Sequence, residues 1–115
     1  MLCFLRDLAN SEWDDIKTRL ASGEFPCDLE YVESNGESFE DLAKRTEGYF
    51  VVGNQRTFRD HAMWVIDCES LSKFRAHVDH IWAPVSNLPI GNMDWDEFKS
   101  AVCADGIYRG HDAEQ

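Results

Sequence analysis

Residues 49–66 read YFVVGNQRTFRDHAMWVI and give the clearest fold signal in the chain. Residues 49–52 and 62–66 are short apolar runs, rich in β-branched and aromatic side chains, which are typical of buried strands. The polar segment between them, residues 53–61, predicts a loop across which the two strands pair antiparallel. A β-hairpin is therefore expected at the centre of the fold.

Two strands and two helices are expected before this hairpin. Residues 1–5 form a short apolar run that favours an edge strand, and residues 28–33 mostly alternate acidic and apolar side chains, as a half-exposed strand does. Ser11 and Ser38 each precede apolar residues at helical spacing and are candidate N-caps. The expected core positions of the two helices are Trp13, Ile16, Leu20, Phe39, Leu42 and Ala43.

Two more helices are expected after the hairpin. Ser70 is the candidate N-cap of the first, Pro84 ends it, and residues 84–92 are expected to form an extended loop. Asp94 and Glu97 predict reciprocal capping at the start of the second helix. The apolar stripes of these helices would be Leu71, Phe74, Val78 and Ile81, and then Trp95, Phe98 and Val102.

This element order predicts an α+β fold, with a small, mainly antiparallel sheet and about four helices on one of its faces. A chain of 115 residues has the size of one domain. We expect residues 1–109 to form a single compact domain and residues 110–115 to form a frayed C-terminal tail.

An excess of acid is the strongest functional signal. The chain has 22 Asp and Glu against 11 Lys and Arg, a net charge of -11, which repels nucleic acid and anionic membranes and attracts basic surfaces. Four Trp and seven Phe argue against disorder. Seven acids, here called the acidic run, follow one another without any Lys or Arg between them: Glu24, Asp28, Glu30, Glu33, Glu37, Glu40 and Asp41.

The acidic run favours a binding protein over an enzyme. Its carboxylates would stand in for phosphates and block a basic, nucleic-acid-handling partner protein, with no direct binding of nucleic acid or membrane. By analogy of size and charge, such inhibitors include DNA mimics, anti-CRISPR and other phage anti-defence proteins, and toxin-neutralising immunity proteins. A solubility role for the acids is the simpler alternative.

A basic-aromatic group, Arg56, Phe58 and Arg59, lies in the expected hairpin loop. Loops on rigid strands commonly carry recognition, and Arg and aromatic residues are frequent interface anchors. We therefore predict that this group is a second contact for the same partner. Trp82 and Trp95, beside the expected proline loop, suggest instead a surface for homo-oligomers.

The alternative function is a small cytosolic enzyme or ligand-binding domain that uses Cys68, His77 and His80. The two histidines would share a helix, and the cysteine would act as a nucleophile or a further metal ligand. The zinc ligand set is incomplete, and both histidines would face solvent if Phe74 and Val78 face the core. We expect no catalytic residue, metal or other cofactor.

The cysteines predict free thiols and a cytoplasmic location. Cys3, Cys27, Cys68 and Cys103 are too widely spaced for paired metal ligands. The apolar start is too short for a signal peptide and lacks a basic leader, and no stretch is long enough to cross a bilayer. Neither a disulfide nor a structural metal is expected.

Overall fold

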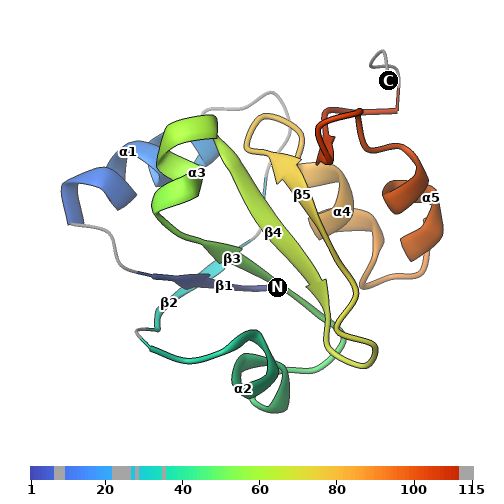
Figure 1. Ribbon diagram of the computed structural model, residues 1–115, viewed down its shortest axis with the longest axis horizontal. Helices are drawn as coiled ribbons and strands as arrows, with labels where there is room; N and C mark the ends of the chain where they lie inside the picture. The colour runs from blue at the N-terminus through green and yellow to red at the C-terminus, as the bar shows by residue number, and fades with distance from the viewer. Residues whose placement is uncertain (7–9, 22–26, 28, 35, 112–115) are drawn as a thin grey trace.

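The computed structural model describes residues 1–6, 10–21, 27, 29–34 and 36–111, and Figure 1 shows the arrangement of their strands and helices. The strands are β1 (Leu2–Leu5), β2 (Glu30–Glu33), β3 (Tyr49–Gly53), β4 (Ala62–Asp67), β5 (Lys73–His77) and β6 (Ile107–Tyr108). The helices among these residues are α1 (Asn10–Ala21), α2 (Phe39–Lys44), α3 (Gln55–Asp60), α4 (Trp82–Asn87) and α5 (Trp95–Ser100).

The strands form one sheet in the order β2-β1-β3-β4-β5-β6. The expected antiparallel pairing of β3 with β4 is confirmed, and β5 extends it antiparallel to β4. The other three pairings, β1 with β2, β1 with β3 and β5 with β6, are parallel. The sheet is therefore mixed, because α1 and α2 each connect one strand to another that runs in the same direction.

The sheet has helices on both faces, whereas one covered face was expected. Side chains alternate along each strand, so Cys3 and Val51 join the core beneath α1, α4 and α5, while Phe4 and Phe50 join the core beneath α2. Figure 1 shows α2 apart from the other helices. The connection from β1 through α1 to β2 moves one way along the sheet, and the connection from β2 through α2 to β3 moves back the other way. Because connections between parallel strands are right-handed, this reversal puts α1 and α2 on opposite faces.

The segment between β3 and β4 is a helix, so the expected loop is wrong. Asn54 caps α3: its Oδ1 accepts hydrogen bonds from the N–H groups of Arg56 and Thr57, and Thr57 Oγ1 accepts from Asn54 N. His61, at a φ of 59°, ends the helix in the left-handed region. This Asn–Thr capping box was the overlooked signal.

The helix expected after Ser70 is also wrong, because residues 73–77 form β5. Phe74 and Ala76, two positions apart, both join the core beneath α1, α4 and α5, as the two-residue period of a strand requires. Leu71 has a φ of 59°, which is incompatible with a helix there. Pro84 does not end a helix but lies in the first turn of α4, where its missing N–H costs nothing.

The other expected helices are confirmed, but α1 begins at Asn10, so Ser11 lies inside the helix and its predicted N-cap role is wrong. Trp13, Ile16 and Leu20 of α1 are buried, and Ser38 Oγ accepts a hydrogen bond from Asp41 N at the start of α2. Glu97 Oε1 accepts from Asp94 N at 3.4 Å at the start of α5. No helix in the described part of the chain is long and apolar enough to span a membrane.

Candidate functional site: two cavities around Tyr49

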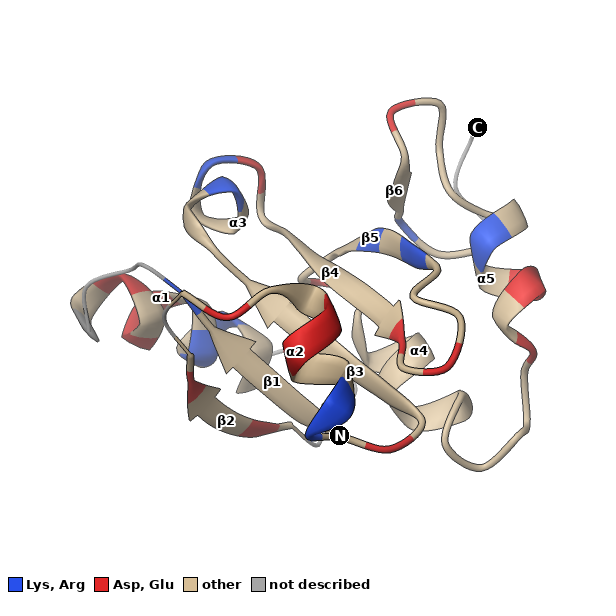
Figure 2. Ribbon diagram, turned by 60° about the horizontal axis from the view of Figure 1, so that its bottom comes forward, with Lys and Arg blue, Asp and Glu red and all other residues tan. Residues whose placement is uncertain are grey.

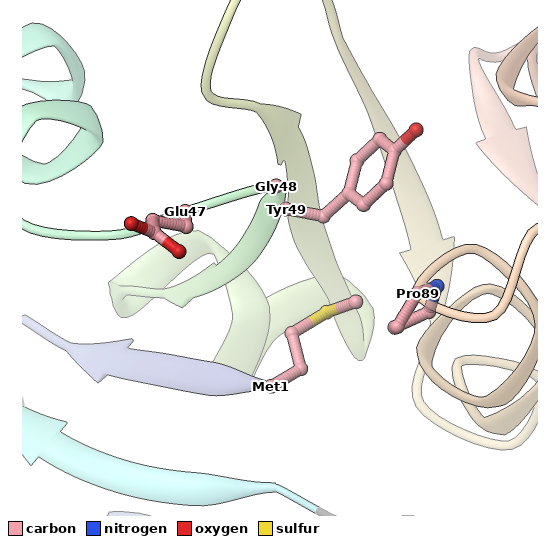
Figure 3. Close-up of a pocket in the computed structure, with 5 residues that line it drawn as sticks. All are labelled: Met1, Glu47, Gly48, Tyr49 and Pro89. Carbon is pink, nitrogen blue, oxygen red and sulfur yellow. The ribbon is translucent and has the colours of Figure 1, made fainter.

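Two adjoining cavities, here called the Tyr49 cavities, lie at the sheet end where β3 begins and β4 ends. Each has a volume of about 390 Å³, and Glu47, Gly48 and Tyr49 line both. Met1 and Pro89 complete the first cavity; Figure 3 shows the Met1 side chain reaching toward the space between Tyr49 and Pro89. Ala43, Thr46, Asp67, Cys68 and Glu69 complete the second.

Strand pairing explains why these residues meet. Tyr49 lies opposite Asp67 in the antiparallel β3–β4 pair, so the residues before β3 and after β4 gather at one end of the sheet. Cys68 N donates to Gly48 O at 2.9 Å, and Thr46 Oγ1 lies 3.0 Å from Cys68 Sγ. The Tyr49 ring stacks on Trp95, with ring centroids 5.6 Å apart, and this contact fixes the aromatic wall.

Three carboxylates line the second of the Tyr49 cavities, and Glu47 also lines the first; we call Glu47, Asp67 and Glu69 the acidic rim. Among the described residues none of the three forms an ion pair with Lys or Arg. The nearby cations have other contacts: Lys73 Nζ lies 5.1 Å from the Phe39 ring centre, and Lys99 Nζ donates to Ser72 Oγ. The acidic rim therefore keeps its negative charge available.

The field of these acids acts on Tyr49 itself. Burial raises the pKa of the Tyr49 phenol above its ordinary value of 10.0, and the negative charges of Asp67, Asp94 and Glu69 raise it further. The phenol accordingly stays neutral and keeps its O–H donor at physiological pH. Neutral aromatic walls with carboxylates at the mouth suit an ammonium or guanidinium group.

The five described members of the acidic run do not lie on one face of the molecule. Glu30 and Glu33 are exposed on β2, an edge strand, but their odd spacing directs them to opposite faces of the sheet. Glu37 forms an ion pair with Arg45, whereas Glu40 and Asp41 are exposed in the first turn of α2. Glu24 and Asp28 lie outside the described residues. Figure 2 shows acidic segments on β2 and α2 and near the β4–β5 turn.

The basic-aromatic group lies on α3 rather than on a loop. Phe58 is 42 % exposed and lines a cavity of about 290 Å³ with Ile16 and Val78. Arg56 and Arg59 are exposed on the same helix, and Arg56 Nε lies 3.5 Å from Asp60 Oδ2. Asp15 and Arg19 of α1 and His61 complete the cavity wall. An apolar pocket beside an exposed phenylalanine is a suitable receptor for one apolar side chain.

The structure separates Cys68 from the two histidines that were grouped with it. Cys68 follows β4, whereas His77 pairs with Ala62 at the opposite end of that strand, on the order of 15–20 Å away at about 3.3 Å per residue. His77 ends β5 and His80 lies in the turn that follows, so they do not share a helix. The proposed nucleophile–base group is therefore wrong.

No metal-binding cluster is present in the part of the chain that the structure describes, where no three His, Cys, Asp or Glu side chains are placed to share an ion. The four cysteines are free thiols. Burial raises the pKa of the Cys3 thiol far above its ordinary value, which makes this cysteine a poor nucleophile.

The acidic rim was not predicted from the sequence, although the predicted strand pairing implies part of it. Once residues 49–52 and 62–66 are paired antiparallel, Glu47 and Asp67 must lie at the same end of the sheet. The acidic run was predicted as a binding surface because its members lie close together in the sequence. Strand pairing, which brings distant residues together, is the better guide to a shared surface.

The fold and these cavities define an α+β domain with an acidic, aromatic-walled site. The chain belongs to the family described as "Domain of unknown function (DUF6924)", whose model matches residues 5–111. A search of curated proteins gave no match.

A solved structure of similar fold is the prolyl-tRNA synthetase of Cryptosporidium parvum, complexed with L-proline and AMP. It has a TM-score of 0.51 and 5 % sequence identity over 89 % of this chain and 25 % of the synthetase chain. At this identity the likeness shows the fold alone. This chain corresponds to about a quarter of the length of that synthetase chain.

Proposed function

We propose that this protein is an acidic binding protein that occupies the basic surface of a nucleic-acid-handling protein and blocks it. The observation that carries the proposal is the acidic rim: three carboxylates line one of two adjoining cavities, and none forms an ion pair with a basic side chain among the described residues. Glu37, in contrast, forms an ion pair with Arg45. The unpaired rim is thus suited to a cation from another molecule.

The Tyr49 cavities would receive a Lys or Arg side chain of the partner. The apolar part of that side chain would lie along Tyr49 and Met1, and its charged end would meet the acidic rim. The exposed acids Glu30, Glu33, Glu40 and Asp41 would steer the approach, because peripheral charges act mainly on association rate. Phe58 with Arg59 would form the second contact.

Three double variants with the same change in net charge test which acids bind. E47Q/E69Q neutralises the acidic rim, E30Q/E33Q neutralises the strand β2 part of the acidic run, and D14N/D96N neutralises two exposed acids elsewhere. Asp67 is kept because it accepts hydrogen bonds from Glu69 N and Ser70 Oγ within its turn.

Each variant would be used to capture proteins from a lysate of the source cells at rising salt, with the captured protein identified and its affinity measured. We expect E47Q/E69Q to weaken capture about tenfold, equivalent to roughly 1.4 kcal/mol, and D14N/D96N to have little effect. Equal loss in all three variants would mean that only net charge matters. A captured partner that still binds nucleic acid while bound would contradict the blocking role.

A further inference from the structure

A cavity of about 330 Å³ lies between α4, the chain leading into α5, and the segment after β6. Its polar side chains include Asn87 and Tyr108 as well as the basic His80, Arg109 and His111, and Trp82 and Met93 supply apolar walls. This volume lies at the lower end of the range of small-molecule sites, which combine an apolar lining with a few convergent polar groups.

The lining of this cavity differs from that of the others in its acidic residues. A carboxylate lines each of the Tyr49 cavities and the cavity beside Phe58, but the described residues that line this one include no Asp or Glu. In a chain with a net charge of -11, a wall of one guanidinium and two imidazoles is a local exception. It suits an anion, because no carboxylate among the described lining residues repels it.

Asp105 holds the guanidinium in place from outside the cavity. Arg109 Nη1 and Nη2 donate to the two carboxylate oxygens of Asp105 at 2.9 and 2.6 Å. The arginine lowers the pKa of Asp105 to about 2, so the pair stays ionised. Because Asp105 already balances one positive charge, the cavity fits a singly charged ligand better than a polyphosphate.

The two imidazoles line the same cavity as Arg109 and are held by other contacts. Tyr108 is buried and its Oη lies 2.9 Å from His111 Nδ1, while the Phe98 and His111 ring centres are 5.5 Å apart. His80 faces Gly110, where a Cβ would lie 3.2 Å from His80 Nδ1 at a φ of +92°. Because residue 110 is a glycine, the chain after β6 can pass close to the His80 ring.

We infer that this cavity binds a small carboxylic acid with an apolar body. The carboxylate would lie against Arg109, His80 and His111, and the body would lie against Trp82 and Met93. Arginine and imidazole N–H groups supply the charge-assisted hydrogen bonds that recognise a carboxylate. This site and its ligand are separate from the Tyr49 cavities and do not depend on the proposed function.

The test uses three ring compounds of one shape: benzoate, neutral benzamide and cationic benzamidine. Binding is followed through the indole N–H signals of the four tryptophans in a two-dimensional NMR spectrum, assigned by single Trp→Phe variants. Benzoate should shift the Trp82 signal in a saturable way, and benzamide should do so at least tenfold more weakly. Equal shifts with both compounds would overturn the inference, because the carboxylate would then contribute nothing.

Arg109→Gln should weaken benzoate binding about tenfold or more. Arg56→Gln is the matched control, because Arg56 is also an exposed arginine beside an aspartate four positions away, outside this cavity. His111→Gln, at an exposed position, is the second variant and should weaken binding several-fold even if R109Q alters the fold. Wild-type affinity in both R109Q and H111Q, or equal loss in R56Q, would refute the site.

Discussion

The two ends of the β3–β4–β5 hairpins carry the same kinds of charged residue but use them differently. At the end where Tyr49 pairs with Asp67, the acidic rim has no basic partner among the described residues. At the end where Ala62 pairs with His77, two aspartates are paired with arginine: Asp60 with Arg75, and Asp79 with Arg19.

This difference separates acids that are paired with arginine from acids that form no ion pair among the described residues. Arg75 is only 4 % exposed and donates to Ala62 O at 2.9 Å as well as to Asp60 Oδ1 at 2.8 Å. Trp64 covers it, with the guanidinium carbon 5.4 Å from the ring centre. A net charge of -11 does not by itself reveal which carboxylates a partner meets; the pairing of each one decides it.

The largest expected effect comes from removing the Asp60 charge. Burial alone would raise the pKa of Asp60, but hydrogen bonds from Arg75 and Ala62 lower it below its ordinary value, so the carboxylate is ionised. Asp60→Asn would leave the buried Arg75 without its counter-charge. We expect the free energy of unfolding to fall by about 2–3 kcal/mol, below the usual range for buried pairs because 33 % of the Asp60 side chain is exposed.

Urea unfolding measures this loss, and Glu69→Gln from the acidic rim is the control. Because Glu69 is exposed and unpaired among the described residues, E69Q should change stability by no more than about 0.5 kcal/mol. If E69Q destabilises the protein as much as D60N does, the acidic rim is structural and the contrast between the two ends is lost.

The sequence predicted the central hairpin and the first two helices because their signals are local: apolar period, capping serines and β-branched runs. It failed at β5, where Phe74, Val78 and Ile81 lie at helical spacing by coincidence while Leu71 breaks the helix with a positive φ. It also missed the parallel pairing of β1 with β3, because nothing local in residues 2–5 encodes a partner that follows two helices later.

The candidate site was less predictable than the fold. Which residues share a surface depends on which strand ends lie side by side. Glu30 and Glu33 are close in sequence but point to opposite faces of the sheet, whereas Glu47 and Glu69 are distant in sequence and line one cavity. The grouping of Cys68 with His77 failed for the same reason, since antiparallel pairing placed them at opposite ends of β4.

The second contact should affect binding without affecting the fold. Phe58 and Arg59 are both exposed on α3, so alanine at both positions should leave the urea midpoint nearly unchanged. If they are interface anchors, each truncation should cost about 1–2 kcal/mol of binding to the captured partner. An unfolded double variant would show that Phe58 is structural, and full-strength binding would leave the acidic rim to act alone.

A smaller effect is expected from the pH dependence of the His77 end. Burial lowers the pKa of His77 below its ordinary value of 6.5, although Asp79 opposes this shift, and Arg19, His80 and His61 add to it. The folded protein thus prefers neutral His77. Its contribution to stability is fully present above pH 6.5 and is lost as the pH falls through the lowered pKa.

His77→Gln should therefore reduce the fall in the free energy of unfolding between pH 7.5 and pH 5. His111→Gln is the control, because it removes a different histidine and should leave the fall nearly as in the wild type. A steeper fall in H77Q would mean that charged His77, paired with Asp79, is the favoured folded form. The His77 end would then gain stability from a charged group at low pH, and neutral His77 would not be the favoured folded form.

The smallest expected effect concerns the exposed pair at the same end. Arg19 donates to Asp79 through Nε and Nη2, both at 3.0 Å, which is favourable two-point geometry. The side chains are, however, 40 % and 50 % exposed, so water screens the attraction and ordering two flexible groups offsets part of it. A double-mutant cycle with R19Q and D79N should give a coupling free energy of about 0.5 kcal/mol that shrinks as salt rises. If the coupling free energy equals the loss of unfolding free energy in D60N, the burial of Arg75 is not what makes an ion pair strong at this end. The two-point geometry of the arginine–aspartate contact would then be the main determinant.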